Sequence, residues 1–181
     1  MAAAEQKEGW LAACEQQGVY LVLTRRMVAE LAGALKELSN GTVLEVCAGA
    51  GRLASALSSC GLEMVATDVS PQGPEVLPLS AREALLRFRP AVMLGSFVPF
   101  DAGVDEEILN SSSAKHYVVL NARIGGRLGS PALWNHPEWT CERLPSIERP
   151  MICRHDVWLD CERGVKQHGE AWHFRRLSLT G

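Results

Sequence analysis

Two acidic residues flank a glycine-rich turn in the first half of the chain. In the stretch VLEVCAGAGRLA, from Val43 to Ala54, Glu45 lies in an apolar run that Gly49 and Gly51 follow, and Asp68 ends the next apolar run. Glycines let a backbone turn tightly and approach a ligand closely. A carboxylate in an apolar strand is costly unless it has a partner. Glu45 therefore indicates a cationic ligand rather than a pyrophosphate.

The spacing of the glycines also fits a second class of ligand. Gly49, Gly51 and Ala54 satisfy the pattern G-x-G-x-x-G/A, and Asp68 stands about where the ribose-binding acid of a dinucleotide fold would lie. An NAD(P)-dependent oxidoreductase is therefore an alternative. Against it, the chain lacks the second nucleotide-binding half that a full dinucleotide domain uses.

The elements that must position these residues alternate along the chain. We expect helices over 25–38, 81–88 and 105–109, with a short one after the glycine turn. We expect strands over 42–46, 63–67, 76–79, 91–95 and 117–120. Two final runs, 152–160 and 167–177, predict an antiparallel hairpin, whereas 124–150 stays unassigned. This order predicts an α/β fold with a mostly parallel sheet and helices on both faces.

Ligands of such a sheet bind beyond the carboxyl ends of its strands. Polar residues lie at or just past several of the expected strand ends, and they should converge on one edge: Glu45, Asp68, Ser80, Ser96 and Asn121. Ser80 and Ser96 follow the third and fourth expected strands. We therefore include both among the candidate binding residues.

The segments VLEVCAGAGRLASAL and VATDVS resemble the cofactor-binding core of class I S-adenosylmethionine-dependent methyltransferases. By this resemblance, Glu45 is the acid of the first strand, Gly49 and Gly51 pack under the ligand, and Asp68 holds the ribose hydroxyls. The resemblance implies a three-layer Rossmann-like sandwich with a C-terminal antiparallel hairpin. It also implies S-adenosylmethionine as cofactor and S-adenosylhomocysteine as product. Ser80 and the turn after Ser96 depart from the family's usual motifs, so a non-catalytic interaction module with this fold is a further alternative.

Residues that would act on the acceptor are harder to find, because methyl transfer mainly requires alignment and exclusion of water. His168 begins the last expected strand at the ligand-binding edge, and His136 lies in a loop-like stretch beside Trp134. These two histidines are the candidate catalytic residues. Trp134 is a candidate to cover that edge.

Size and composition limit the remaining possibilities. The 181 residues, 47% hydrophobic with a formal charge of -3, fit one methyltransferase-like domain, with a helical segment over 1–40 and an α/β core over 41–181. The charge favours no nucleic-acid partner, and no apolar run is long enough for a membrane span. A small-molecule acceptor is expected, with a peptide or protein side chain second, because no large inserted domain is visible in the sequence.

Cysteine usage and the first residues point to a reducing compartment. Six cysteines are spread along the chain without a C-x-x-C pair, so we expect free thiols and no metal site. Glu5, Lys7 and Glu8 occupy the place where a signal peptide would need its apolar region. A cytoplasmic protein is the expectation.

Overall fold

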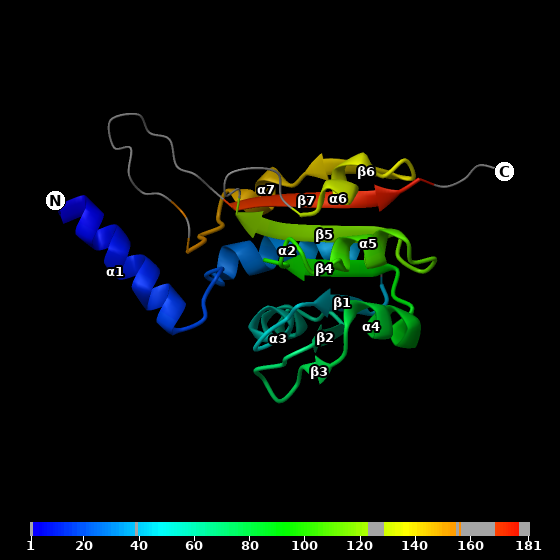
Figure 1. The fold of residues 1–181 in the computed structure, drawn as a ribbon, viewed down its shortest axis with the longest axis horizontal. Helices are drawn as coiled ribbons and strands as arrows, with labels where there is room; N and C mark the ends of the chain where they lie inside the picture. Colours follow the sequence, from blue (N-terminus) through cyan, green and yellow to red (C-terminus); the bar gives the residue numbers. More distant parts are fainter. Residues whose placement is uncertain (1, 39, 123–128, 155, 157–168, 178–181) are drawn as a thin grey trace.

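A seven-stranded sheet forms the centre of the protein (Figure 1). The structure is a computed structural model that describes residues 2–38, 40–122, 129–154, 156 and 169–177. The strands are β1 (Val43–Val46), β2 (Met64–Asp68), β3 (Leu77–Pro78), β4 (Val92–Ser96), β5 (His116–Ala122), β6 (Trp139–Arg143) and β7 (Gly169–Arg176). The helices are α1 (Ala2–Gln16), α2 (Arg25–Leu38), α3 (Arg52–Ser59), α4 (Ala81–Phe88), α5 (Val104–Leu109), α6 (Pro131–Asn135) and α7 (Pro145–Glu148).

The strand order is β3-β2-β1-β4-β5-β7-β6. From β3 to β5 all neighbours are parallel, whereas β7 runs antiparallel to both β5 and β6. The predicted α/β class, with a mostly parallel sheet and an antiparallel C-terminal pair, is confirmed. The arrowheads of β4 and β5 point toward the side on which α1 lies, so α1 is next to the carboxyl edge of the sheet (Figure 1).

Helices cover the two faces of the sheet and form two apolar clusters. One cluster joins α2, α3 and α7 to the sheet through residues such as Leu31, Leu57 and Ile147. The other joins α4, α5 and α6 to the opposite face through residues such as Leu85 and Ile108. The sheet is therefore the middle of three layers. Because both of its faces are buried, its central strands are continuously apolar, as β1 is apart from one acid.

Helix α2 forms over the range that the sequence predicts. The Thr24 hydroxyl accepts a hydrogen bond from the Met27 amide at 3.2 Å and caps the helix. Met27, Leu31 and Leu35 recur at helical spacing, and all three are fully buried. None of the described helices has the length and apolarity needed to cross a bilayer.

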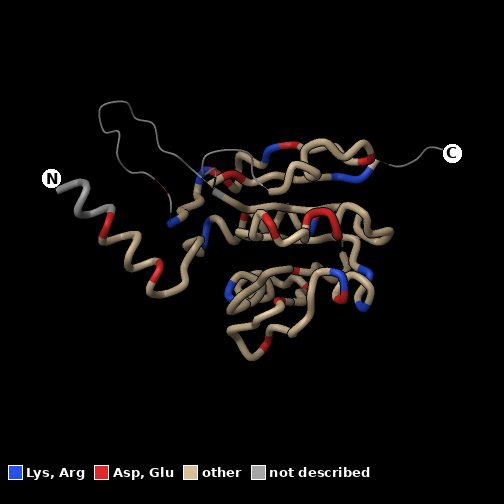
Figure 2. Tube along the Cα trace, viewed as in Figure 1, with Lys and Arg blue, Asp and Glu red and all other residues tan. Residues whose placement is uncertain are grey.

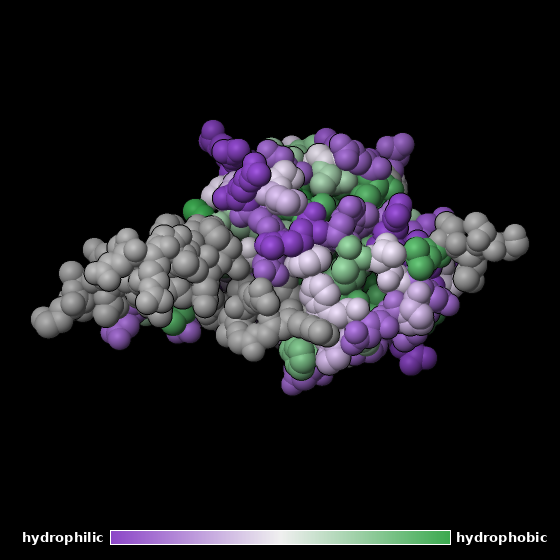
Figure 3. All heavy atoms as spheres, turned by 90° about the horizontal axis from the view of Figure 1, so that it is seen from above, coloured by the Kyte–Doolittle hydropathy of each residue, from purple (hydrophilic) through white to green (hydrophobic). Residues whose placement is uncertain are grey.

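The last strand has a different partner from the one expected. β7 pairs with β6, whose residues lie in the stretch left unassigned, so the predicted pairing of 152–160 with 167–177 is wrong for the described residues. Residues 157–168 lie outside the described part of the chain, and Cys153 forms an isolated bridge with Leu21. β6 is an edge strand with four of its five residues exposed, so it has no apolar alternation to detect. Figure 3 views the molecule from above relative to Figure 1, and the surface coloured there is mainly hydrophilic.

Candidate functional site

The turn that follows β1 has a left-handed backbone at both glycines. The φ angle is 54° at Gly49 and 72° at Gly51, a region that other residues rarely enter. A Cβ added at Gly51 would lie 2.7 Å from Val76 Cγ2, whereas one added at Gly49 would meet nothing within 4 Å. Gly51 is therefore required by packing, and the space beside Gly49 is open.

Asp68 braces this turn from the end of β2. Its Oδ2 accepts a hydrogen bond from the Gly49 amide at 2.8 Å, and its Oδ1 accepts one from the Ser70 amide at 2.8 Å. Each carboxylate oxygen can accept two hydrogen bonds. Asp68 therefore orders the glycine turn and still has capacity for two further donors.

Glu45 lies beneath the turn and is almost removed from water. It is 2% exposed, and the Ala54 amide of α3 hydrogen-bonds to its carboxyl group. Its Oε2 has no hydrogen-bond partner among the described residues. Burial raises the pKa of Glu45 from 4.5 to about 8. A buried carboxyl oxygen without a partner is costly, so a ligand that brings a donor or a positive charge would stabilise it.

The chain changes direction across the sheet between β1 and β4. These strands are neighbours, but the chain leaves β1 through α3 toward β2 and leaves β4 through α5 toward β5. We call the region beyond these strand ends the crevice, because ligands of open α/β sheets bind at such a switch point. Cys47 and Phe97, which follow the two strands, have φ angles of 54° and 56° although neither is glycine. Strained residues of this kind concentrate at functional sites.

Four carboxyl groups act on the thiol of Cys47. Burial, followed by the negative charges of Asp68, Asp105, Glu107 and Glu45, raises its pKa to about 11. The thiol is therefore protonated at neutral pH and is a poor nucleophile. Glu45 holds a proton at neutral pH in the free protein, so the other carboxylates near Cys47 are the ones that make the crevice favourable for a cation. The sequence does not reveal the left-handed conformation of Cys47 or Phe97, because it arises where the ladder ends.

Asp105 links three elements beside the crevice. It is 5% exposed and accepts hydrogen bonds from the Tyr117 hydroxyl at 2.9 Å and from the Ser130 amide at 2.7 Å. The Tyr117 hydroxyl in turn lies against Gly95, where an added Cβ would be 2.6 Å away. Burial raises the pKa of Asp105. This residue belongs to the acidic first turn of α5, which is drawn red in Figure 2.

The two serines expected to bind a cofactor have different surroundings. Ser80 caps α4, since its hydroxyl accepts a hydrogen bond from the Glu83 amide at 3.3 Å and donates one to Glu83 Oε2 at 2.8 Å. Its hydroxyl is thus already used, although it lies on the carboxyl edge. Ser96 ends β4 at the same edge, half-buried and paired with Leu120. A cofactor contact by either serine stays a prediction.

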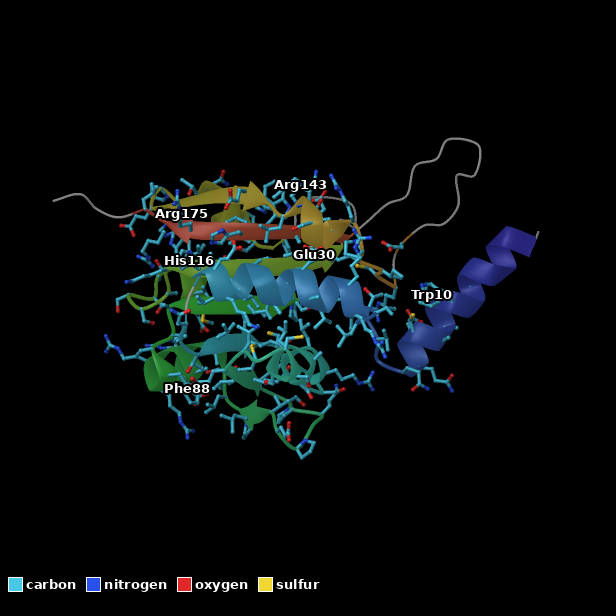
Figure 4. All side chains as sticks on the ribbon, turned by 180° about the vertical axis from the view of Figure 1, so that it is seen from behind. Trp10, Glu30, Phe88, His116, Arg143 and Arg175 are labelled. Carbon is cyan, nitrogen blue, oxygen red and sulfur yellow. The ribbon has the colours of Figure 1, made fainter. Side chains whose placement is uncertain are left out.

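Of the two candidate catalytic histidines the structure describes His136, which does not lie at the glycine turn. His136 precedes β6, and the register places the start of β6 level with the start of β5. Figure 4 shows His116, the first residue of β5, at the end of the sheet away from Trp10 of α1. His136 therefore lies at the amino edge, opposite the crevice, because β6 runs in the same direction as β5. His168 lies outside the described residues.

Trp134 is partly buried and packs against the sheet instead of covering the carboxyl edge. Its ring contacts Trp172 edge-on, with the centroids 4.9 Å apart, and it lies 5.3 Å from Phe174. Both partners belong to β7, so this tryptophan attaches α6 to the sheet.

A second titratable cluster lies across β5, β7 and β6. His116 Nδ1 lies 3.0 Å from His173 Nε2, and His173 Nδ1 lies 3.1 Å from Glu142 Oε1. Within the described ranges no group of three or more His, Cys, Asp or Glu side chains is arranged to hold a metal ion. The five cysteines that the structure describes are free thiols.

No protein-family model and no curated protein sequence matches the chain. Solved structures do match. The 23S rRNA methyltransferase ErmE is similar with a TM-score of 0.55 at 15% identity, over 88% of this chain and 70% of that chain. The Burkholderia thailandensis 1,6-didemethyltoxoflavin-N1-methyltransferase, solved with its namesake ligand and S-adenosylhomocysteine, has a TM-score of 0.52 at 13% identity, over 85% of this chain and 78% of that one.

These likenesses establish the fold. The strand order, the helices on both faces and the matched structures are those of the class I S-adenosylmethionine-dependent methyltransferases. The resemblance drawn from the glycine turn and its two acids is therefore confirmed at the level of the fold.

Proposed function

We propose that the protein transfers a methyl group from S-adenosylmethionine to a small-molecule acceptor. The proposal is carried by the buried Oε2 of Glu45, which has no hydrogen-bond partner among the described residues and lies under a glycine turn that Asp68 braces. A sulfonium ligand with an ammonium group would bring a hydrogen-bond donor and a positive charge to this oxygen. The open space beside Gly49 is where a nucleoside can approach the backbone.

The residues present fit this ligand in distinct roles. The free acceptor capacity of Asp68 suits the two ribose hydroxyls, and the carboxyl groups around Cys47 favour the positively charged part. The bound donor supplies an activated methyl group. The chain contributes alignment of the acceptor with the methyl group and exclusion of water from the site.

A small acceptor is favoured over nucleic acid by charge. The net charge is -3, and acidic groups act on the crevice, so phosphates would be repelled there. A protein side chain is the second acceptor class. The dinucleotide alternative gains no support from the topology, because β7 is inserted antiparallel between β5 and β6 where a dinucleotide fold continues in parallel.

Isothermal calorimetry with S-adenosylmethionine, S-adenosylhomocysteine and NADH tests the proposal. We expect heat with the first two ligands and none with NADH. Asp68→Asn keeps the size of the side chain but removes its charge, so it should weaken both affinities by about tenfold to a hundredfold, the worth of a hydrogen bond to a charged group. Asp101→Asn, at an exposed carboxylate that follows β4, is the matched control and should bind normally. Absence of heat at millimolar S-adenosylhomocysteine would contradict the proposal.

A further inference from the structure

A cavity of about 530 Å³ lies between α4 and α5. We call it the α4–α5 cavity. Leu85 and Leu86 line it from α4, and Asn110 with the serines at 111–113 lines it where α5 leads into β5. The residues from 45 to 54, around the glycine turn, do not line it. Cavities of this size hold small organic ligands, so this one is a candidate binding site separate from the crevice.

The two walls of the α4–α5 cavity carry opposite charges. Arg82 and Arg89 line it from α4, and Glu106 and Glu107 line it from α5. Figure 2 shows this division, with blue arginines on α4 and red acids on α5. Within the described ranges no ion pair joins the two walls. Both signs of charge are therefore available to a ligand.

Glu106 adds an unsatisfied acceptor to the acidic wall. Its side chain is half-buried, and its Oε2 is buried without a hydrogen-bond partner in the described part of the chain. Its backbone carbonyl, by contrast, accepts hydrogen bonds from the Asn110 amide at 3.0 Å and from Asn110 Nδ2 at 2.8 Å. A buried oxygen without a donor is costly. A ligand ammonium group at this wall would supply both a donor and the opposite charge.

Arg176 of β7 fixes the loop that ends the cavity. Its Nη2 donates hydrogen bonds to the Leu109 carbonyl at 2.6 Å and to the Ser111 carbonyl at 2.7 Å, and its Nε donates one to the Ala114 carbonyl at 3.1 Å. Within the loop the hydroxyls of Ser111 and Ser113 lie 3.1 Å apart. The loop is therefore a defined surface, with hydroxyl groups that can bond to the amides of a ligand.

The spacing of the two walls limits the ligand. α4 and α5 contact each other, and packed helices lie about 8–10 Å apart. The ammonium and carboxylate of a single amino acid are too close together to reach both walls, whereas three extended residues span about 10 Å. Leu85 is buried and Leu86 is 73% exposed, so the two provide an apolar surface beside the charges.

We propose that the α4–α5 cavity binds a zwitterionic ligand whose ammonium and carboxylate groups lie about 10 Å apart on an apolar body, as in a free tripeptide. The carboxylate lies at Arg82 and Arg89, since guanidinium groups match the geometry of carboxylates. The ammonium lies at Glu106 and Glu107. This site goes beyond the proposed methyl transfer and needs no cofactor, so either proposal can fail without the other.

Four tripeptides test this in titrations of the isotope-labelled protein, followed by amide chemical shifts in NMR spectra. Alanyl-leucyl-alanine carries both charges, its N-acetyl derivative lacks the ammonium, its amide lacks the carboxylate, and alanyl-seryl-alanine lacks the apolar side chain. We expect the first to bind and each of the others to bind about fivefold more weakly. The shifted amides should be those of 110–113 and not those of Gly49 and Gly51. Equal affinities, or no binding of alanyl-leucyl-alanine, would overturn the inference.

Reversal of the basic wall provides a second test. Arg82→Glu combined with Arg89→Glu places acids on both walls, so the amidated peptide should then bind more tightly than the free tripeptide. Arg25→Glu combined with Arg87→Glu is the matched control, because it changes the net charge equally outside the cavity and should keep the wild-type order. All four arginines are exposed, so we expect both variants to fold. The same order of affinities in the two variants would contradict the site.

Leu86→Ser tests the apolar surface separately. It should weaken alanyl-leucyl-alanine about threefold and leave alanyl-seryl-alanine unchanged, because only the leucyl peptide loses an apolar contact. Unchanged binding of both peptides would show that they bind elsewhere.

Discussion

At the scale of single residues, the buried acid of β1 has the largest consequence. Glu45 belongs to a strand that is otherwise apolar, and its carboxyl group accepts a hydrogen bond from the Ala54 amide. Desolvation outweighs that hydrogen bond, and the pKa of the carboxyl group rises to about 8. The free protein therefore binds a proton here at neutral pH.

This proton makes stability depend on pH. The pKa of Glu45 is about 8 in the folded state against 4.5 ordinarily. Between these values the folded state holds a proton that the unfolded state has lost, so stability is full below pH 4.5 and falls as pH rises toward 8. We expect Glu45→Gln to lose less stability than the wild type between pH 5 and pH 8. Urea unfolding across that range measures the difference.

A cationic ligand should reverse this effect. Positive charge beside Glu45 lowers its pKa, so binding of S-adenosylmethionine near pH 7 should release protons, which calorimetry in buffers of different ionisation enthalpy detects. For the pH dependence itself, parallel curves of unfolding free energy against pH for the wild type and Glu45→Gln would contradict the raised pKa of this carboxyl group.

At the scale of elements, the glycine turn and α4 show how local structure serves the site. The turn is packed from outside by the connection between β2 and β3, since the Gln72 amide donates to the Gly49 carbonyl at 2.9 Å. That connection, residues 69–76, contains no helix in this protein. The turn therefore depends on close backbone contacts in place of a covering helix.

Gly51 and Gly33 have different environments and make a matched pair of substitution sites. Gly51→Ala should destabilise the protein by about 2 kcal/mol or more, because the left-handed backbone alone costs 1–2 kcal/mol and the new Cβ would meet Val76 at 2.7 Å. Gly33→Ala in α2, where nothing lies within 4 Å, should stabilise it by about 0.5–1 kcal/mol. Thermal unfolding of both variants checks this, and equal shifts would contradict the packing role of Gly51.

The cap of α4 gives a second test at this scale. Ser80→Ala removes the capping box with Glu83 and should cost about 0.5–2 kcal/mol. Because the hydroxyl is engaged in the cap, we expect the affinity for S-adenosylhomocysteine to change by less than about twofold. Calorimetry beside thermal unfolding separates the two roles. A larger loss of affinity would establish Ser80 as a cofactor contact.

At the scale of the whole molecule, buried polar contacts hold the elements around the crevice in register. Asp105 joins α5, β5 and the segment at Ser130, and the Tyr117 hydroxyl is its partner from the sheet. These groups lie between layers, so the loss of one leaves another unsatisfied.

Tyr117→Phe tests this arrangement. It deletes the hydroxyl and leaves the buried Asp105 with one donor fewer, so we expect a loss of about 1–3 kcal/mol in the free energy of unfolding. Tyr20→Phe is the control, because the exposed Tyr20 keeps its ring and should unfold like the wild type. Urea titration of both variants provides the measurement. Equal stability of the two would mean that Asp105 is satisfied without Tyr117.

The sequence by itself determined the elements whose signal is local. The apolar runs of β1 and β4, the helical period of α2 and the glycine turn between two acids can each be read without neighbours. Burial on both faces leaves a continuous apolar run, and burial on one face leaves a helical period. With the resemblance, these features predicted the fold class and the positions of Glu45, Gly49, Gly51 and Asp68 at one edge.

Only the tertiary structure decided what depends on contacts between distant segments. The exposed β6 carries no apolar pattern, so its pairing with β7, and with it the position of His136 at the opposite edge, could not be predicted. The left-handed Phe97 and its contact with Tyr20 likewise arise where strands end and the N-terminal segment packs. Periodicity reports which side of an element is buried, but not what covers it.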